Sequence, residues 1–155
     1  MSLKSNQEGF SSYSKIYCFT MDLKVMNKSN FVETATIEEY IAYLYLAIAG
    51  SDLIITEKEL YKIGRRISGI LVQHFPDSKF EFKSLLRSVK KEVQSRSPMD
   101  YSRQIELLNK KYPLAMDIQM DVVSDLNEII NVDDKIEYSE YVLMNFIKVC
   151  FIEKK

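Results

Sequence analysis

The sequence predicts an all-α protein, a single compact bundle of six or seven helices, and three observations favour this class. The chain has 155 residues, enough for one domain with a substantial core. Its four Gly and three Pro are too few for a turn-rich β protein, and its 46% hydrophobic content argues against disorder. From Thr36 onwards, apolar residues recur at helical spacing between capping and breaking signals.

The chain is expected to comprise an N-terminal segment, residues 1–35, and a helical domain, residues 36–155. The N-terminal segment carries two competing patterns. Five apolar residues alternate as in a strand: Tyr17, Phe19, Met21, Leu23 and Val25. An overlapping set has helical spacing: Ile16, Phe19, Leu23 and Met26. A helical or partly irregular segment is favoured.

A capping box predicts the start of each of the first two helices of the domain. Thr36 with Glu39 opens one whose apolar stripe ends at Gly50, and Thr56 with Glu59 opens the next. The second helix is expected to end at the "HFPDS" break, which begins at His74. The unit is helix, turn, helix.

Four further helices are expected downstream. Residues 79–96 place apolar side chains on one side and basic ones on the other. Ser97-Pro98 and Tyr112-Pro113 are break-and-restart signals, so helices are expected at about 98–111 and 113–131. The last helix, at about 137–153, is apolar nearly all round and is therefore expected to run through the middle of the bundle.

One short pattern occurs twice. "AGSDLIITEKEL", residues 49–60, returns in looser form as "INVDDKIEYSEY", residues 130–141, and a shift of 81 residues superimposes Asp52 on Asp133 and Glu59 on Glu140. Each copy joins the end of one helix to the start of another. This predicts two pseudo-repeated helical hairpins in which the Ile between the acids is buried and the carboxylates face water.

The two acidic loops are candidate cation sites, because carboxylate oxygens are the hard ligands that Ca²⁺ and Mg²⁺ prefer. The predicted metal ligands are Asp52, Glu59, Asp133 and Glu140. A true EF-hand is excluded, because the positions that should open such loops with acids carry Ile or Asn and Gly instead.

The pattern Ala-x-x-Asp-x-x-Ile-Thr-x-x-Glu-Leu, with the weaker Asp-Asp-x-Ile-x-x-x-Glu near the C-terminus, resembles the TerB-like (tellurite resistance protein B-like) domains of stress operons. The resemblance covers residues 36–152. It implies an all-helical domain without a known catalytic role, an acidic surface thought to bind metal, and membership in stress-response or phage-defence assemblies. The chain departs from the family in carrying Leu53 and Asp134 where Gly usually follows the first acid.

Structural roles compete with metal binding at these positions. Glu59 is the expected capping partner of Thr56, and Asp52 suits a turn that bonds backbone amides. Glu137 stands where the second copy would need its capping Thr, so Glu140 is harder to assign to a cap. A favourable interaction with the helix dipole accounts for it equally well.

The net charge of −1 conceals a charge asymmetry. Residues 79–111 carry nine Lys or Arg against four acids, and residues 121–140 carry seven acids against Lys135. The basic stripe, formed by Lys83, Arg87, Lys90 and Lys91, is interpreted as a solvated face rather than a nucleic-acid site, since it lacks interleaved exposed aromatics. It could equally dock an acidic protein partner, including residues 121–140 of a second copy, which leaves a homodimer open.

Other features fit a cytoplasmic protein without direct membrane insertion. The longest apolar tract, residues 141–152, is too short to span a bilayer. Cys18 and Cys150 each lie in an apolar run, which favours buried, reduced thiols. His74, the only histidine, is expected near a helix C-terminus in a capping role rather than a catalytic one.

The sequence contains no phosphate-binding glycine loop, nucleophile elbow or Cys-His pair. It therefore predicts a non-enzymatic TerB-like binding or scaffold domain of a bacterial stress-response system that binds a divalent cation weakly at its acidic loops. The alternative is an accessory enzyme or small-molecule hydrolase that uses paired carboxylates between the hairpins.

Overall fold

The computed structural model describes residues 31–51, 55–131 and 138–152, and within these ranges every regular element is a helix. The chain divides into two units, Met1–Thr34 and Ala35–Lys155. Residues 31–34 of the first unit are helical. The second unit contains α2 (Ile37–Gly50), α3 (Glu57–His74), α4 (Phe82–Gln94), α5 (Pro98–Lys111), α6 (Met116–Asn131) and α7 (Tyr138–Ile152). The all-α prediction is confirmed for the described residues.

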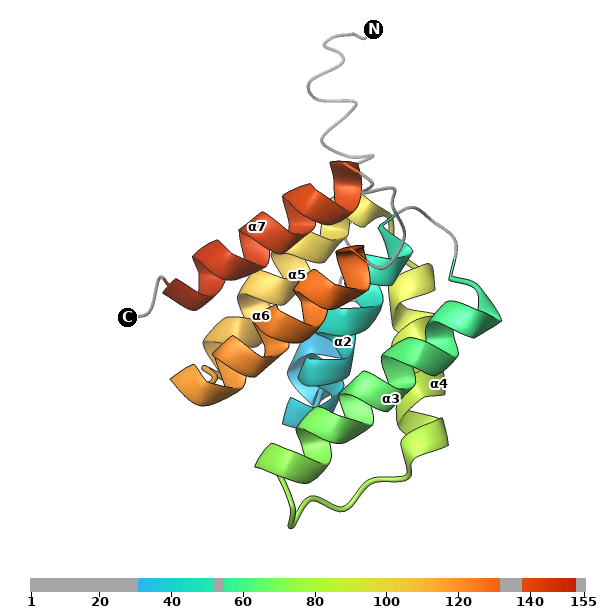
Figure 1. The fold of residues 1–155 in the computed structure, drawn as a ribbon, viewed down its shortest axis with the longest axis vertical. Coiled ribbons are helices and arrows are strands. Elements are labelled where there is room, and N and C mark those ends of the chain that lie inside the picture. Colours follow the sequence, from blue (N-terminus) through green and yellow to red (C-terminus); the bar gives the residue numbers. More distant parts are fainter. Residues whose placement is uncertain (1–30, 52–54, 132–137, 153–155) are drawn as a thin grey trace, which may run out of the picture. The chain divides into compact units, whose positions relative to one another are not determined.

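The central element of this unit is α2 (Figure 1). It contacts every other labelled helix, and all of its residues from Tyr40 to Gly50 are buried. Two of its tyrosine hydroxyls have acceptors on the surrounding helices: Tyr40 donates to Asn109 of α5 and Tyr45 donates to Asp125 of α6. A buried hydroxyl without a partner is destabilising, so these bonds allow a tyrosine-rich helix to occupy the core.

The prediction that the last helix runs through the middle of the bundle is wrong. One side of α7 packs on α5, α6 and α2, while Tyr138, Tyr141, Val142, Val149 and Ile152 are exposed on it. Both α2 and α7 are apolar nearly all round, but only α2 combines large side chains with Ala42, Ala47, Ala49 and Gly50. These small residues let neighbouring helices approach it from every side.

Gly50 has a packing role rather than the predicted capping one. A Cβ at this position would lie 2.9 Å from Val93 Cγ1 and 3.0 Å from the Tyr101 hydroxyl, so any larger residue would push α4 and α5 away from α2. Ser51 is the C-cap of α2, with right-handed backbone angles (φ −66°, ψ −20°). The helix therefore ends without a left-handed glycine.

Most helix boundaries agree with the predictions from local signals. Both capping boxes are present, and Ser97-Pro98 begins α5. Two helices start later than predicted. α4 begins at Phe82 because Glu81 accepts hydrogen bonds from the backbone amides of Lys83 and Ser84 and forms the cap. α6 begins at Met116, and Leu114 in the preceding turn is buried in the core.

Within the ranges that the structure describes, no helix has both the length and the apolar character needed to cross a membrane.

The positions of α2 and α7 predict that an Ile→Ala substitution lowers the free energy of unfolding by different amounts in the two helices. Ile48→Ala, in fully buried α2, is expected to lower the free energy of unfolding by about 2–5 kcal/mol through lost burial and a residual cavity. The matched change Ile152→Ala, at a position 77% exposed on α7, should cost less than about 0.5 kcal/mol. Urea denaturation measures both, and equal losses would contradict the assignment of α2 as the central helix.

Candidate functional site

The helix ends beside the two junctions singled out by the sequence lie next to each other. Ser51, the C-cap of α2, and Ser139, in the first turn of α7, have their hydroxyl oxygens 3.5 Å apart. The first junction precedes α3 and the second follows α6. One end of the helical unit therefore brings together two chain segments that are 88 residues apart.

Of the four predicted metal ligands, two are described. Glu59 lies in the first turn of α3, and its Oε1 accepts the Thr56 amide at 3.0 Å, while the Glu59 amide donates to Thr56 Oγ1 at 3.1 Å. The capping role is thus confirmed and still leaves a second carboxylate oxygen. Glu140 lies half-buried in the first turn of α7. Asp52 and Asp133 lie outside the described residues, so a four-carboxylate site stays a prediction.

The predicted inward isoleucine of the first loop is confirmed. Ile55 is 8% exposed, and its Cδ1 lies 3.6 Å from the point where a Cβ on Gly50 would stand. Its burial anchors the start of α3 against the end of α2. Ile136, its counterpart in the second copy, lies outside the described residues. Across the described part of the chain, no cluster of three or more His, Cys, Asp or Glu side chains has metal-binding geometry.

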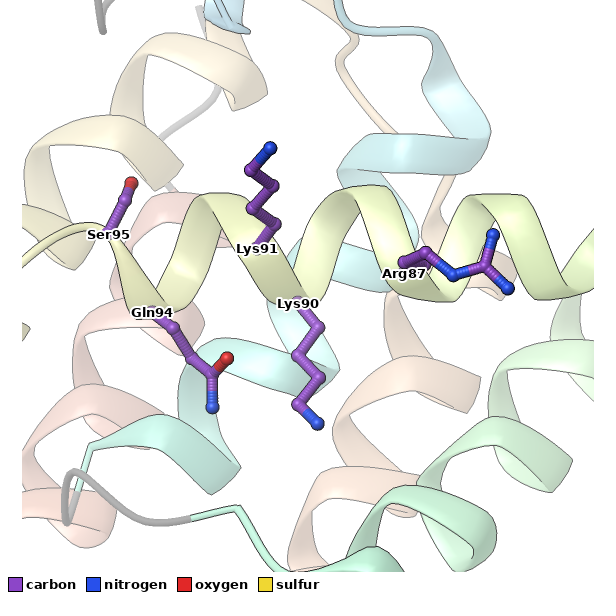
Figure 2. A pocket seen from close by; sticks show the side chains of 5 residues that line it. All are labelled: Arg87, Lys90, Lys91, Gln94 and Ser95. Carbon is purple, nitrogen blue, oxygen red and sulfur yellow. The ribbon is translucent and has the colours of Figure 1, made fainter.

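The basic stripe lies on the solvent side of α4 and lines a shallow depression of about 420 Å³ (Figure 2). Its lining residues are Arg87, Lys90, Lys91, Gln94 and Ser95. Figure 2 shows Lys90 and Lys91 leaving opposite sides of the helix, so their ammonium groups do not converge on one point. Lys90 Nζ also lies 3.9 Å from a Glu57 carboxylate oxygen. The geometry is that of an open basic face rather than an enclosed anion pocket.

A polar network that the sequence did not predict joins α3, α6 and α2. Asp125 accepts the Tyr45 hydroxyl at 2.7 Å and Arg66 Nη1 at 2.8 Å, and the same guanidinium pairs with Glu128. Burial, reinforced by the hydrogen bond to Asp125, raises the pKa of Tyr45 above its ordinary value. Partial burial alone would lower the pKa of Arg66, but its bonds to the two carboxylates outweigh this and raise it.

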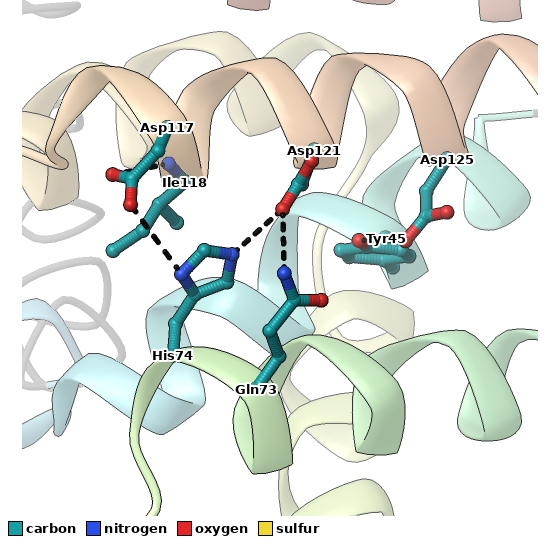
Figure 3. A network of polar contacts seen from close by, with 7 residues as sticks. All are labelled: Tyr45, Gln73, His74, Asp117, Ile118, Asp121 and Asp125. Carbon is teal, nitrogen blue, oxygen red and sulfur yellow. Dashed lines mark hydrogen bonds and ion pairs between the residues drawn. The ribbon is translucent and has the colours of Figure 1, made fainter.

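His74 forms the second half of the α3–α6 contact (Figure 3). It is the last residue of α3, and its Nε2 lies 2.8 Å from Asp121 Oδ2 while its Nδ1 lies 3.8 Å from Asp117 Oδ2. Gln73 Nε2 approaches the same Asp121 oxygen at 3.4 Å. The predicted position at a helix end is confirmed, but the ring binds carboxylates of another helix.

This network changes the interpretation of the acid-rich segment. Asp121, Asp125 and Glu128 lie in the segment that the sequence marked as an acidic surface, yet all three hold α6 against α3. The available signal was their helical spacing with Asp117, which places four acids along one side of α6. That spacing reveals an acidic face but does not show which basic side chains lie opposite it.

Cys150 is buried on α7, as predicted, and its carbonyl accepts a hydrogen bond from Asn109 Nδ2 at 3.1 Å. Cys18 lies outside the described residues.

Comparison with family models, with curated proteins and with solved structures finds no match for this chain. The TerB-like resemblance therefore rests on the residues quoted for it.

Asp125 is the acceptor that Tyr45 and Arg66 share, so its removal should show how much the network contributes to stability. Asp125→Ala leaves the buried Tyr45 hydroxyl without its acceptor and should cost about 1–3 kcal/mol of unfolding free energy. Glu128→Ala removes a carboxylate whose side chain is 55% exposed and should cost less than about 1 kcal/mol.

Adding Tyr45→Phe to Asp125→Ala should recover part of the loss, because the orphaned hydroxyl is then absent. Chemical denaturation of the three variants is the measurement. If Asp125→Ala lowers the free energy of unfolding no more than Glu128→Ala does, the result would contradict a stabilising link between Asp125 and Tyr45.

The cap of α4 predicts a pH dependence. Hydrogen bonds from the Ser84 side chain and backbone lower the pKa of Glu81 below its ordinary value. A pKa depressed in the folded state contributes stability above the unfolded pKa, about 4.3, and this contribution is lost as the pH falls through the folded pKa.

Glu81→Gln should therefore flatten the acid-side fall of the melting temperature below about pH 4.3. Melting curves between pH 2 and 7 test this expectation, with Asp77→Asn, an exposed acid outside the helices, as control. Parallel profiles for wild type and Glu81→Gln would refute the capping contribution.

Proposed function

We propose that the chain is a non-enzymatic, TerB-like binding or scaffold domain of a bacterial stress-response system that binds a divalent cation weakly at its acidic loops. The resemblance of residues 36–152 to TerB-like domains suggests the system. In this proposal α2–α3 and α6–α7 form the two pseudo-repeated hairpins. Each pair of helices is in contact, which is compatible with that arrangement.

The observation that carries the proposal is the contact between Ser51 and Ser139. Asp52 follows Ser51 in the sequence, and Glu140 follows Ser139. Two loops flanked by contacting residues can supply oxygen ligands to one ion, and Ca²⁺ accepts six to eight such ligands in flexible geometries. Glu59 keeps one carboxylate oxygen beyond its cap, so capping and ligation are compatible at this position.

A binding role is also supported by what the other polar groups do. His74, Asp121, Asp125 and Arg66 are engaged across the α3–α6 contact. Groups that hold two helices together are less available for proton transfer or nucleophilic attack. A hydrolase would therefore depend on the same loop carboxylates, which makes the two functions separable by one set of variants.

A thermal-shift titration with Ca²⁺, Mg²⁺ and Mn²⁺ tests the cation site. A ligand that binds only the folded state stabilises it by RT ln(1 + [L]/Kd), about 2.7 kcal/mol at a hundredfold excess over Kd. We expect at least one cation to raise the melting temperature of the wild type, and Asp52→Asn or Asp133→Asn to abolish the shift.

Asp77→Asn, in the α3–α4 connection, is the matched control and should retain the full shift. A flat response to all three cations would refute the cation site and leave the scaffold role alone. Hydrolysis of chromogenic esters or phosphoesters that disappears in Asp133→Asn would instead favour the hydrolase.

A further inference from the structure

The outward side of α7 is an apolar stripe in the described part of the chain. Tyr138 is 82% exposed, Tyr141 53%, Val142 47%, Val149 47% and Ile152 77%. At 3.6 residues per turn these side chains, with exposed Asn145, fall within an arc of about 100°. The opposite side of the same helix is buried by α5, α6 and α2. α7 thus has an apolar face beyond the one its own bundle uses.

Two exposed methionines of α6 lie near one end of α7. Gln119 Nε2 lies 3.5 Å from the Phe151 carbonyl, which places the N-terminal half of α6 beside the C-terminal end of α7. Met116, three residues before Gln119, and Met120, directly after it, are each 65% exposed. Exposed apolar side chains that line up on one helix face, as on α7, mark an interaction site rather than ordinary scattered residues.

Four of the five apolar residues are placed symmetrically along the helix; Val142 is the exception, because its counterpart three residues beyond Asn145 is half-buried Lys148. Asn145 stands at its centre, Tyr141 and Val149 lie four residues to either side, and Tyr138 and Ile152 lie seven residues to either side. An antiparallel pair of α7 helices related by a twofold axis at Asn145 therefore sets Tyr138 against the partner's Ile152 and Tyr141 against the partner's Val149. Such self-complementarity is what a twofold interface between identical chains requires.

Asn145 suits the centre of such a pair. A side-chain amide carries both a donor and an acceptor, so two amides that meet at a twofold axis can satisfy each other. A single polar residue in an otherwise apolar helix seam also favours one register over the alternatives. The residue that looks out of place on an apolar stripe is therefore explained by pairing with its own copy.

The exposed area fits a modest dimer. The five apolar side chains leave roughly 500 Å² of accessible surface per copy, given about 150–250 Å² for a whole aromatic side chain. Two copies would together bury about 1,000 Å², the lower bound for a specific interface, before the two methionines are counted. This area predicts reversible association rather than a permanent complex.

We propose that the chain forms a twofold homodimer through antiparallel packing of α7 against α7, centred on Asn145. This surface is distinct from the basic face of α4, and its use does not depend on cation binding. The proposal is tested with the full chain by sedimentation velocity over roughly 1–500 µM, the range in which an interface of this size dissociates. We expect a concentration-dependent monomer–dimer equilibrium.

Val149→Lys should weaken that association at least tenfold, because it places a charge on the stripe. Val72→Lys, at a valine 68% exposed on α3, is the matched control and should leave the equilibrium unchanged. A chain that stays monomeric throughout would overturn the proposal. So would a dimer that resists Val149→Lys but is lost in Lys90→Glu/Lys91→Glu, since this would place the interface on α4.

The register has its own test. Asn145→Cys should form an interchain disulfide rapidly under mild oxidation, because residues at a twofold axis face each other. Wild type and Val72→Cys should not cross-link at that rate. Equal cross-linking at the two positions would overturn the antiparallel pairing. A monomer whose melting temperature falls in Val149→Lys would mean that the stripe is covered within one chain, which also overturns the dimer.

Discussion

The burial of α2 from Tyr40 to Gly50 is the constraint on which the second unit depends. A helix buried on every side needs an apolar neighbour in each direction, and an acceptor offsets the cost of a hydroxyl that it takes into the core. Asn109 accepts the hydrogen bond from the Tyr40 hydroxyl, and Asp125 accepts the one from Tyr45. Asn109 also donates to the Cys150 carbonyl, so one side chain ties α5 to both α2 and α7. The polar residues of the surrounding helices are placed by this requirement.

The acids of α6 follow from the same constraint. Asp125 satisfies a buried tyrosine and pairs with Arg66, and Asp121 binds His74 one turn earlier. Three of the seven acids of residues 121–140 thus hold α6 against α3. The acids proposed for cation binding are a different set, Asp52, Glu59, Asp133 and Glu140.

The proposed roles use two different surfaces. The cation site is proposed near the contact of Ser51 with Ser139, whereas the apolar stripe runs along the outer side of α7. A dimer formed through α7 would present two copies of the loops that are proposed to bind the cation. This arrangement fits a scaffold, in which the positions of binding sites matter more than chemistry at any one of them.

The sequence by itself determined the helical class, most helix boundaries and the capping boxes, because these depend on residues three or four positions apart. It also indicated the inward position of Ile55 and the burial of Cys150. Only the tertiary structure decided that α2 and not α7 is central, that Gly50 admits α4 and α5, and that His74 and Arg66 bind α6. Those outcomes depend on which surfaces meet across many residues, and helical periodicity reports that a side is apolar without saying what covers it.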